Sequence, residues 1–131
     1  MTRQPILLAV LTLLTGCLDD MCGNRVLDTV ASPDWRQAAV IFERDCGATT
    51  RASTQVSILP AGEVPSEAGN VFVAETDTGS DPSRTRGPGV EVAWLGPNQL
   101  RIRYPRSATI FKRLEERVGV QITYGLSDAG D

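Results

Sequence analysis

Alternating hydrophobic and polar positions predict an all-β fold for most of this chain. Short runs rich in Val, Ile, Phe and Tyr are separated by Pro, Gly, Asp and Ser, which are the usual turn residues. The expected strands are residues 26–30, 38–43, 54–59, 70–74, 90–95, 99–104 and 118–124. Six or seven short strands must bury one face, so we expect a small antiparallel meander that curls into a sandwich or partly open barrel.

The apolar positions of these runs define the expected core. They are Val26, Val30, Val40, Phe42, Val56, Ile58, Val71, Val73, Val92, Trp94, Ile102, Val120 and Ile122. This set is of adequate size for a domain of about 100 residues.

The segment 108–117 fits a helical period and a strand period about equally well. A short helix would place Phe111 and Leu114 on one face that caps the sheet. Its solvated face would carry Lys112, Arg113, Glu115 and Glu116. An irregular turn remains the alternative here.

Two hairpins follow from the turn residues. The turn Ser32-Pro33-Asp34-Trp35 predicts a first hairpin centred on Asp34, and Gly96-Pro97-Asn98 predicts a second. The first would pair Val30 with Ala38, Val26 with Phe42, Arg25 with Glu43 and Cys22 with Cys46. The second would pair Trp94 with Leu100, Val92 with Ile102 and Val90 with Tyr104 inside, and Glu91 with Arg103 outside.

Residues 1–16 have the layout of an export signal, with Arg3 as the one charge before the apolar run 6–14. That run is too short to span a bilayer. The tetrapeptide Leu14-Thr15-Gly16-Cys17 resembles the bacterial lipobox, which implies cleavage before Cys17 and lipidation of its thiol. Two or more acyl chains make a lasting membrane anchor. The alternative is an ordinary secretory signal that happens to contain a cysteine.

Lipidation of Cys17 would leave Cys22 and Cys46 of the three cysteines. Exported compartments favour disulfides, and the first hairpin places these two opposite each other. We expect a structural disulfide that stabilises the fold by roughly 3 kcal/mol. The chain then divides into a signal (1–16), a tether (17–24), a β domain (25–125) with a mobile loop (76–89), and a tail (126–131).

Charge and position after cleavage suggest a location. Loss of Arg3 changes the net charge from −3 to −4. In Gram-negative lipoproteins an Asp directly after the lipidated Cys favours inner-membrane retention, whereas here Leu18 follows Cys17. We therefore expect the periplasmic side of the outer membrane rather than the inner membrane.

Composition excludes several chemistries. The chain has no His, so Ser-His-Asp and Cys-His catalysis and His-ligated zinc cannot be built from it. With 13 basic against 16 acidic residues and no basic block, we expect no nucleic-acid partner. Glu75, Asp77 and Asp81 lack the spacing of a calcium loop, so we expect no metal and no cofactor.

The run from Val40 to Thr50, with its Arg-Asp-Cys-Gly-Ala-Thr-Thr core, resembles a family of small bacterial exported proteins, and the resemblance continues through residues 54–60 and 69–74. The resemblance brings no known activity. In that family the first turn usually reads Ser-Pro-Asp-Gly, whereas Trp35 occupies the glycine position in this chain. A polar loop pinned by the disulfide could form a binding surface. That candidate surface consists of Arg44, Asp45, Thr49, Thr50 and Arg51.

These observations predict a lipid-anchored interaction or assembly module of the cell envelope, with a possible envelope protein partner and no catalytic site. One alternative is a periplasmic inhibitor that presents a loop to a lysozyme or protease. The other is an enzyme that uses Glu43 and Asp45, two apart on one strand face, as an acid/base pair.

Overall fold

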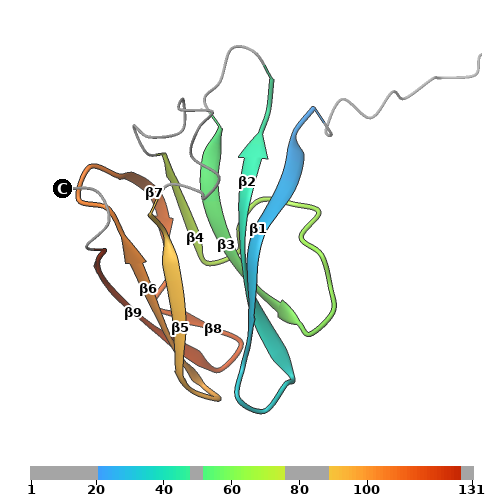
Figure 1. Ribbon diagram of the computed structural model, residues 1–131, viewed down its shortest axis with the longest axis vertical. Helices are drawn as coiled ribbons and strands as arrows, with labels where there is room; N and C mark the ends of the chain where they lie inside the picture. Colours follow the sequence, from blue (N-terminus) through green and yellow to red (C-terminus); the bar gives the residue numbers. More distant parts are fainter. Residues whose placement is uncertain (1–20, 48–51, 76–88, 128–131) are drawn as a thin grey trace, which may run out of the picture.

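The computed structural model describes residues 21–47, 52–75 and 89–127, and these form nine strands and no helix (Figure 1). The strands are β1 (Gly23–Ala31), β2 (Gln37–Asp45), β3 (Ser53–Pro60), β4 (Phe72–Glu75), β5 (Glu91–Gly96), β6 (Gln99–Tyr104), β7 (Thr109–Arg113), β8 (Glu116–Arg117) and β9 (Val120–Leu126). The expected all-β class is confirmed. The described residues contain no helix long and apolar enough to cross a membrane.

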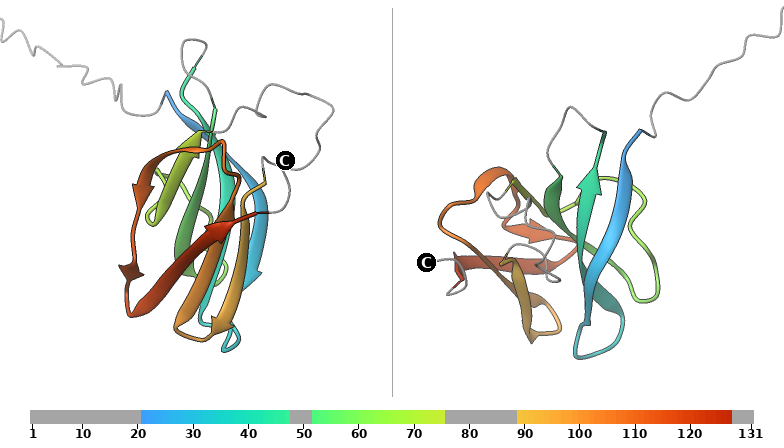
Figure 2. Two further views of the ribbon diagram at one scale, coloured as in Figure 1. Left: turned by 90° about the vertical axis from the view of Figure 1, so that its left-hand side faces the viewer. Right: turned by 45° about the horizontal axis from the view of Figure 1, so that its top comes forward.

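The strands form two sheets that pack face to face (Figures 1 and 2). One sheet has the order β1-β2-β3-β4-β7 and the other β5-β6-β9-β8. One buried cluster draws side chains from both sheets, as expected for a sandwich. Strand pairing is antiparallel except that β6 and β9 run parallel. The fold therefore departs from a simple meander, because the chain crosses to the first sheet as β7 before it returns to the second sheet as β8 and β9.

The centre of the core is aromatic. Phe72 is fully buried, and its ring lies 5.6 Å from that of Tyr104 and 6.0 Å from that of Tyr124 between centroids. Burial raises the pKa of Tyr124 to about 12, so its hydroxyl stays protonated and donates a hydrogen bond to the Leu114 carbonyl. The Arg113 guanidinium lies 4.4 Å from the centre of the same ring.

Most expected core positions are buried, with one clear error. Val26 is 42% exposed, because it lies on the edge strand β1. Val30, Val73, Val92 and Trp94 are only partly buried. The prediction also left out fully buried side chains of β2, β4 and β6 that belong to the core between the sheets. These are Ala39, Phe72, Ala74 and Leu100.

The segment 108–117, in which helix and strand periods fit about equally well, forms strands and no helix. Residues of this segment form β7, which pairs with β4, and β8, which pairs with β9. Phe111 and Leu114 do not cap the sheet, since they are 63% and 36% exposed. A bulge at Phe111 of β7, opposite Val73 and Ala74 of β4, shifts the pairing by one residue. Helix propensity is a weak preference, and pairing with two sheet edges overrides it.

The first hairpin follows the predicted register only near its open end. There Val26 pairs with Phe42, and Arg25 pairs with Glu43 through an ion pair of 2.9 Å. A bulge at Leu27 then shifts the pairing by one, so Val30 faces Ala39 and the predicted Val30–Ala38 pair is wrong. The extra residue packs against the core, which gives the bulge a physical reason.

The disulfide between Cys22 and Cys46 is present, at the open end of this hairpin. It continues the register of the neighbouring pair Gly23–Asp45. The two Cα atoms are 3.8 Å apart, which is closer than the roughly 4.5–5.5 Å between paired residues of antiparallel strands. The disulfide therefore lies where the expected tether (17–24) would enter the β domain.

A strap, defined here as residues 61–71, crosses the outer face of the first sheet (Figure 2). The Asn24 side chain on β1 donates hydrogen bonds to the carbonyls of Pro65 (3.0 Å) and Glu67 (2.9 Å). Two β3 side chains hold its other end, since Gln55 accepts from the Gly69 amide (2.6 Å) and Ser57 accepts from the Asn70 amide (3.0 Å). The sequence predicted only a loop here.

The strap explains the continuous apolar run in β2. Ala39 and Ile41 belong to the core between the sheets, whereas Ala38, Val40 and Phe42 form a second buried cluster on the opposite face. Phe42 is fully buried although it faces away from the other sheet. A strand that is covered on both faces reads as an uninterrupted hydrophobic segment.

Hydrogen bonds organise the β1–β2 turn. Oδ1 of Asp34 accepts from the Ser32 hydroxyl (2.6 Å) and from the Arg36 amide (3.3 Å). The Ser32 hydrogen bond, and then that of Arg36, hold the pKa of Asp34 below its ordinary value of 3.8. Ionised Asp34 thus stabilises this turn.

A pH dependence follows from this carboxylate. Because its folded pKa is lowered, its contribution is fully present above the unfolded value and is lost as pH falls through the folded value. We expect Asp34→Asn to flatten the loss of stability as pH falls below the ordinary pKa of 3.8, as measured by urea unfolding. Ser32→Ala should also reduce the loss of stability at acid pH, because it removes the hydrogen bond that lowers the pKa of Asp34 most. If the free energy of unfolding of Asp34→Asn and of the parent chain fell equally at acid pH, this role of Asp34 would be contradicted.

Candidate functional site

The predicted binding surface lies partly outside the described residues, which leaves Thr49, Thr50 and Arg51 without a structural account. Its two described members have local partners. Arg44 donates to Oδ1 of Asn24 (2.7 Å), and Asp45 accepts from the Gly47 amide (3.0 Å). These contacts organise the disulfide end of the hairpin.

The proposed acid/base pair also has structural partners. Glu43 holds an ion pair with Arg25, and Asp45 closes the turn after β2. Each carboxylate is explained by the contact it already makes.

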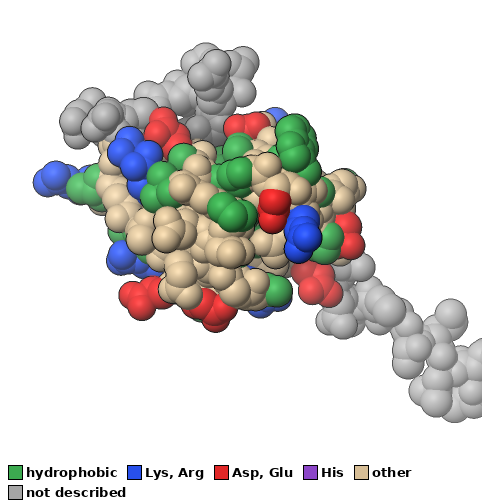
Figure 3. Space-filling model, turned by 90° about the horizontal axis from the view of Figure 1, so that it is seen from below, with side chains coloured by type: hydrophobic (Ala, Val, Ile, Leu, Met, Phe, Trp, Pro, Cys, Tyr) green, Lys and Arg blue, Asp and Glu red, His purple; other side chains and the backbone are tan. Residues whose placement is uncertain are grey.

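A different surface emerges at the opposite end of the sandwich. We call it the tip surface and define it by three exposed apolar side chains: Trp35 in the β1–β2 turn, Leu95 near the end of β5 beside the β5–β6 turn, and Val118 in the β8–β9 turn. Their side chains are 77%, 54% and 71% exposed. Figure 3 views this end directly and shows hydrophobic side chains gathered among charges of both signs.

Contacts between the elements bring these turns together. The indole of Trp94 on β5 donates to the Val30 carbonyl on β1 (2.9 Å), which joins the second sheet to the first hairpin near its turn. The Gln121 amide of β9 donates to the Asn98 carbonyl (2.8 Å), which places the β8–β9 turn beside the β5–β6 turn. All three turns therefore lie at one end of the molecule (Figure 1).

Two members of the tip surface have unfavourable backbone conformations. Trp35 has a φ of 60° and Val118 a φ of 50°, and they are the two positive-φ residues other than glycine in the described chain. The left-handed region costs roughly 1–2 kcal/mol for such residues, and a β-branched residue rarely adopts it. Glycine or asparagine would suit both turns better. Backbone strain and side-chain exposure thus coincide at the same two residues, Trp35 and Val118.

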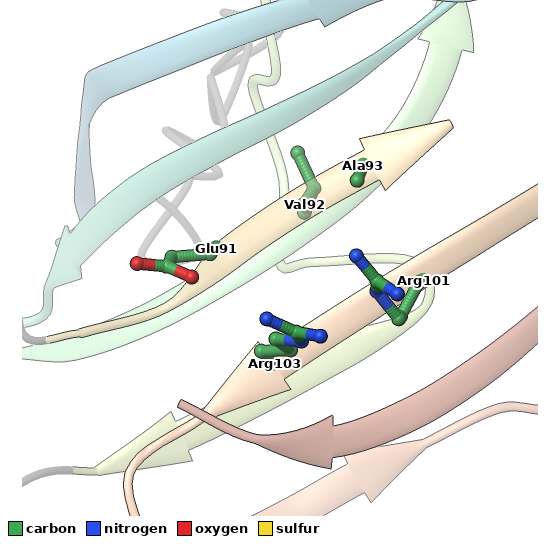
Figure 4. Close-up of a pocket in the computed structure, with 5 residues that line it drawn as sticks. All are labelled: Glu91, Val92, Ala93, Arg101 and Arg103. Carbon is green, nitrogen blue, oxygen red and sulfur yellow. The ribbon is translucent and has the colours of Figure 1, made fainter. Parts of the chain in front are cut away.

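A second feature is a shallow pocket of about 70 Å³ on the outer face of the second sheet (Figure 4). Its lining residues are Glu91, Val92, Ala93, Arg101 and Arg103. The predicted cross-strand pair of Glu91 and Arg103 is confirmed, with Ala93 opposite Arg101. Arg101 and Arg103 lie two apart on β6, so both side chains rise from the same face.

The two guanidinium groups of this pocket have no ion-pair partner among the residues that the structure describes. Among the described residues the ion pair within 4.0 Å is that of Arg25 with Glu43, so Glu91 does not neutralise Arg103 at contact distance. Nε of Arg101 is the one buried side-chain nitrogen or oxygen in this part of the chain without a hydrogen-bond partner. A buried donor without a partner costs about 1–3 kcal/mol.

Sequence reasoning missed both features. The substitution of Trp35 for glycine in the first turn was a usable signal, because a large side chain there requires a special backbone conformation. Arg101 and Arg103 were also readable as a same-face pair that faces one acidic residue. No sequence pattern indicated that Val118 would begin a tight two-residue turn.

Compared with protein-family models, curated proteins and solved structures, the chain matches none of them. Within residues 21–47, 52–75 and 89–127, no group of three or more His, Cys, Asp or Glu side chains could hold a metal ion. Of the three acidic residues weighed as calcium ligands, Asp77 and Asp81 lie outside these ranges.

Proposed function

We propose that this chain is a lipid-anchored module of the bacterial cell envelope that binds a protein partner through its tip surface. The observation that carries the proposal is the coincidence of exposure and strain at Trp35 and Val118. Backbone strain is retained where a function requires it, and exposed Trp side chains are frequent anchors of protein interfaces.

The position of the tip surface supports a docking role. The lipobox resemblance places the anchor at Cys17, five residues before the disulfide at Cys22. β1 runs from that end toward the tip over nine residues, a span of about 30 Å at about 3.3 Å each. The anchor would thus hold one end of the sandwich at the membrane and present the tip surface to the periplasm.

Charge favours a protein over a lipid surface as the partner. The turns that carry Trp35 and Val118 also carry two acidic residues, Asp34 and Glu116, and two basic residues, Arg36 and Arg117, all exposed. A surface that binds anionic lipids would be enriched in Lys and Arg. Mixed charge around apolar anchors is typical of the rim of a protein interface.

The test is in-cell crosslinking from a photoreactive amino acid at position 36. We expect one dominant crosslinked protein, whose yield falls at least about tenfold in Trp35→Gly. That variant should fold at least as well as the parent, because glycine relieves the left-handed strain. In the same cells, Cys17→Ser should move the chain from the membrane to the soluble fraction.

Phe111→Ala is the matched control, since Phe111 is an exposed aromatic residue on β7 outside the tip surface. It should leave the crosslink unchanged. Equal losses in both variants would contradict a specific tip surface. Binding of the purified chain to anionic vesicles, or a crosslink only to a second copy of the chain, would overturn a protein partner. Membrane retention of Cys17→Ser would overturn the lipid anchor.

A further inference from the structure

We infer that Arg101 and Arg103 form a binding site for a carboxylate group, separate from the tip surface. The inference begins from the buried Nε of Arg101, which has no hydrogen-bond partner. Native proteins satisfy nearly all buried donors, so an unsatisfied one calls for an acceptor. Because this atom is buried, the Arg101 side chain must turn toward the adjacent pocket before a carboxylate oxygen there can supply the acceptor.

The geometry suits a planar anion. The side chains of Arg101 and Arg103 lie on the same side of β6 and border one pocket with Glu91 and Ala93 (Figure 4). Guanidinium groups bind carboxylates through two parallel hydrogen bonds. At about 70 Å³, the pocket admits a carboxylate but not a large ligand.

The neighbouring strand β9 places no acidic side chain beside the two arginines. On β9, Thr123 pairs with Arg101 and Gly125 pairs with Arg103, and neither carries a charge. A Cβ atom at Gly125 would lie 3.8 Å from Cγ of Arg103, so its absence leaves the space above this arginine open. No acidic side chain of β9 therefore competes with a ligand.

Charge matching selects a monoanion. Two arginines and one glutamate give the pocket a net charge of +1, which complements one carboxylate. A phosphate dianion would be left partly unbalanced and would be repelled by Glu91. The ligand class is therefore an acidic side chain or a chain-terminal carboxylate, such as one on a peptide.

The experiment follows the arginine Nε–Hε signals of the purified chain by NMR during a titration with acetate at constant ionic strength. We expect a saturable shift of the Arg101 signal and none for Arg25, which already pairs with Glu43. Arg103→Gln should weaken acetate binding about tenfold, since one of the two guanidinium groups is lost. Glu91→Gln should tighten binding, because it removes the repelling charge.

Arg117→Gln is the matched control, because Arg117 is an exposed arginine on β8 that does not line the pocket. It should leave acetate affinity unchanged. A linear response without saturation, or equal losses in Arg103→Gln and Arg117→Gln, would overturn the site. Tighter binding of phosphate than of acetate by the parent chain would overturn the carboxylate assignment. Weaker binding in Glu91→Gln would overturn the charge argument.

Discussion

Replacement of Gly69 with alanine is expected to destabilise the domain by about 3 kcal/mol, because at this residue the strap lies directly against β3 and β4. An added Cβ would lie 2.6 Å from the Phe72 carbonyl oxygen, 2.9 Å from Cβ of Gln55 and 3.0 Å from the Val56 carbonyl oxygen. Two of these atoms belong to the backbone of paired strands, so they cannot move without loss of pairing between β3 and β4.

The surrounding hydrogen bonds increase the expected effect. The Gly69 amide donates to Gln55, and its carbonyl accepts from Nζ of Lys112 (2.9 Å). The side chain of the next residue, Asn70, accepts a hydrogen bond from the Ile58 amide and donates one to the Ile58 carbonyl, both at 2.8 Å. It thus pairs with the β3 backbone as a neighbouring strand would. Displacement of Gly69 would disturb this whole anchor.

Urea unfolding measures the expected loss. Gly96→Ala is the control, because a Cβ there meets nothing within 4 Å. It should change stability by less than about 0.5 kcal/mol. If both alanine variants unfold at the same urea concentration, the strap does not depend on close approach at Gly69.

Loss of the disulfide is the second large effect. The double variant Cys22→Ala, Cys46→Ala should be destabilised by roughly 3 kcal/mol, because a link across 24 residues restricts the unfolded chain. The hairpin should still form, since Arg25–Glu43 and Arg44–Asn24 hold its open end.

Both the disulfide variant and its parent should carry Cys17→Ser, so that no third thiol can pair. Urea unfolding with and without reductant then separates the disulfide from the side-chain changes. Reductant should lower the stability of the parent by about the same roughly 3 kcal/mol and leave the double variant unchanged. An equal midpoint for parent and variant without reductant would contradict a stabilising role.

The first hairpin shows how much of the strand register could be predicted from the local sequence pattern. The register near Val26 and Phe42, and with it the partner of Cys22, followed from counting outward from the Ser-Pro-Asp turn. The bulge at Leu27 did not follow, because it depends on a contact between that side chain and the core. A local count cannot detect a contact with the other sheet.

The strap and segment 108–117 show why parts of the fold could not be predicted from the sequence. The apolar run of β2 required cover on its second face, but nothing in residues 61–71 marked them as that cover. Likewise, the helix-compatible composition of 108–117 was overridden by the free edges of β4 and β9. In both cases the partner lies far away in the sequence.

The candidate sites divide in the same way. The sequence alone determined the all-β class, the second hairpin, the disulfide partners and the lipobox resemblance, because each depends on alternation, turns or motif spacing within short stretches of chain. The tertiary structure decided the parallel β6–β9 pair, the strap, the tip surface and the unpaired Arg101. Each of these depends on which distant segment covers, pairs with or leaves open a given side chain, and that is settled only when the two sheets pack.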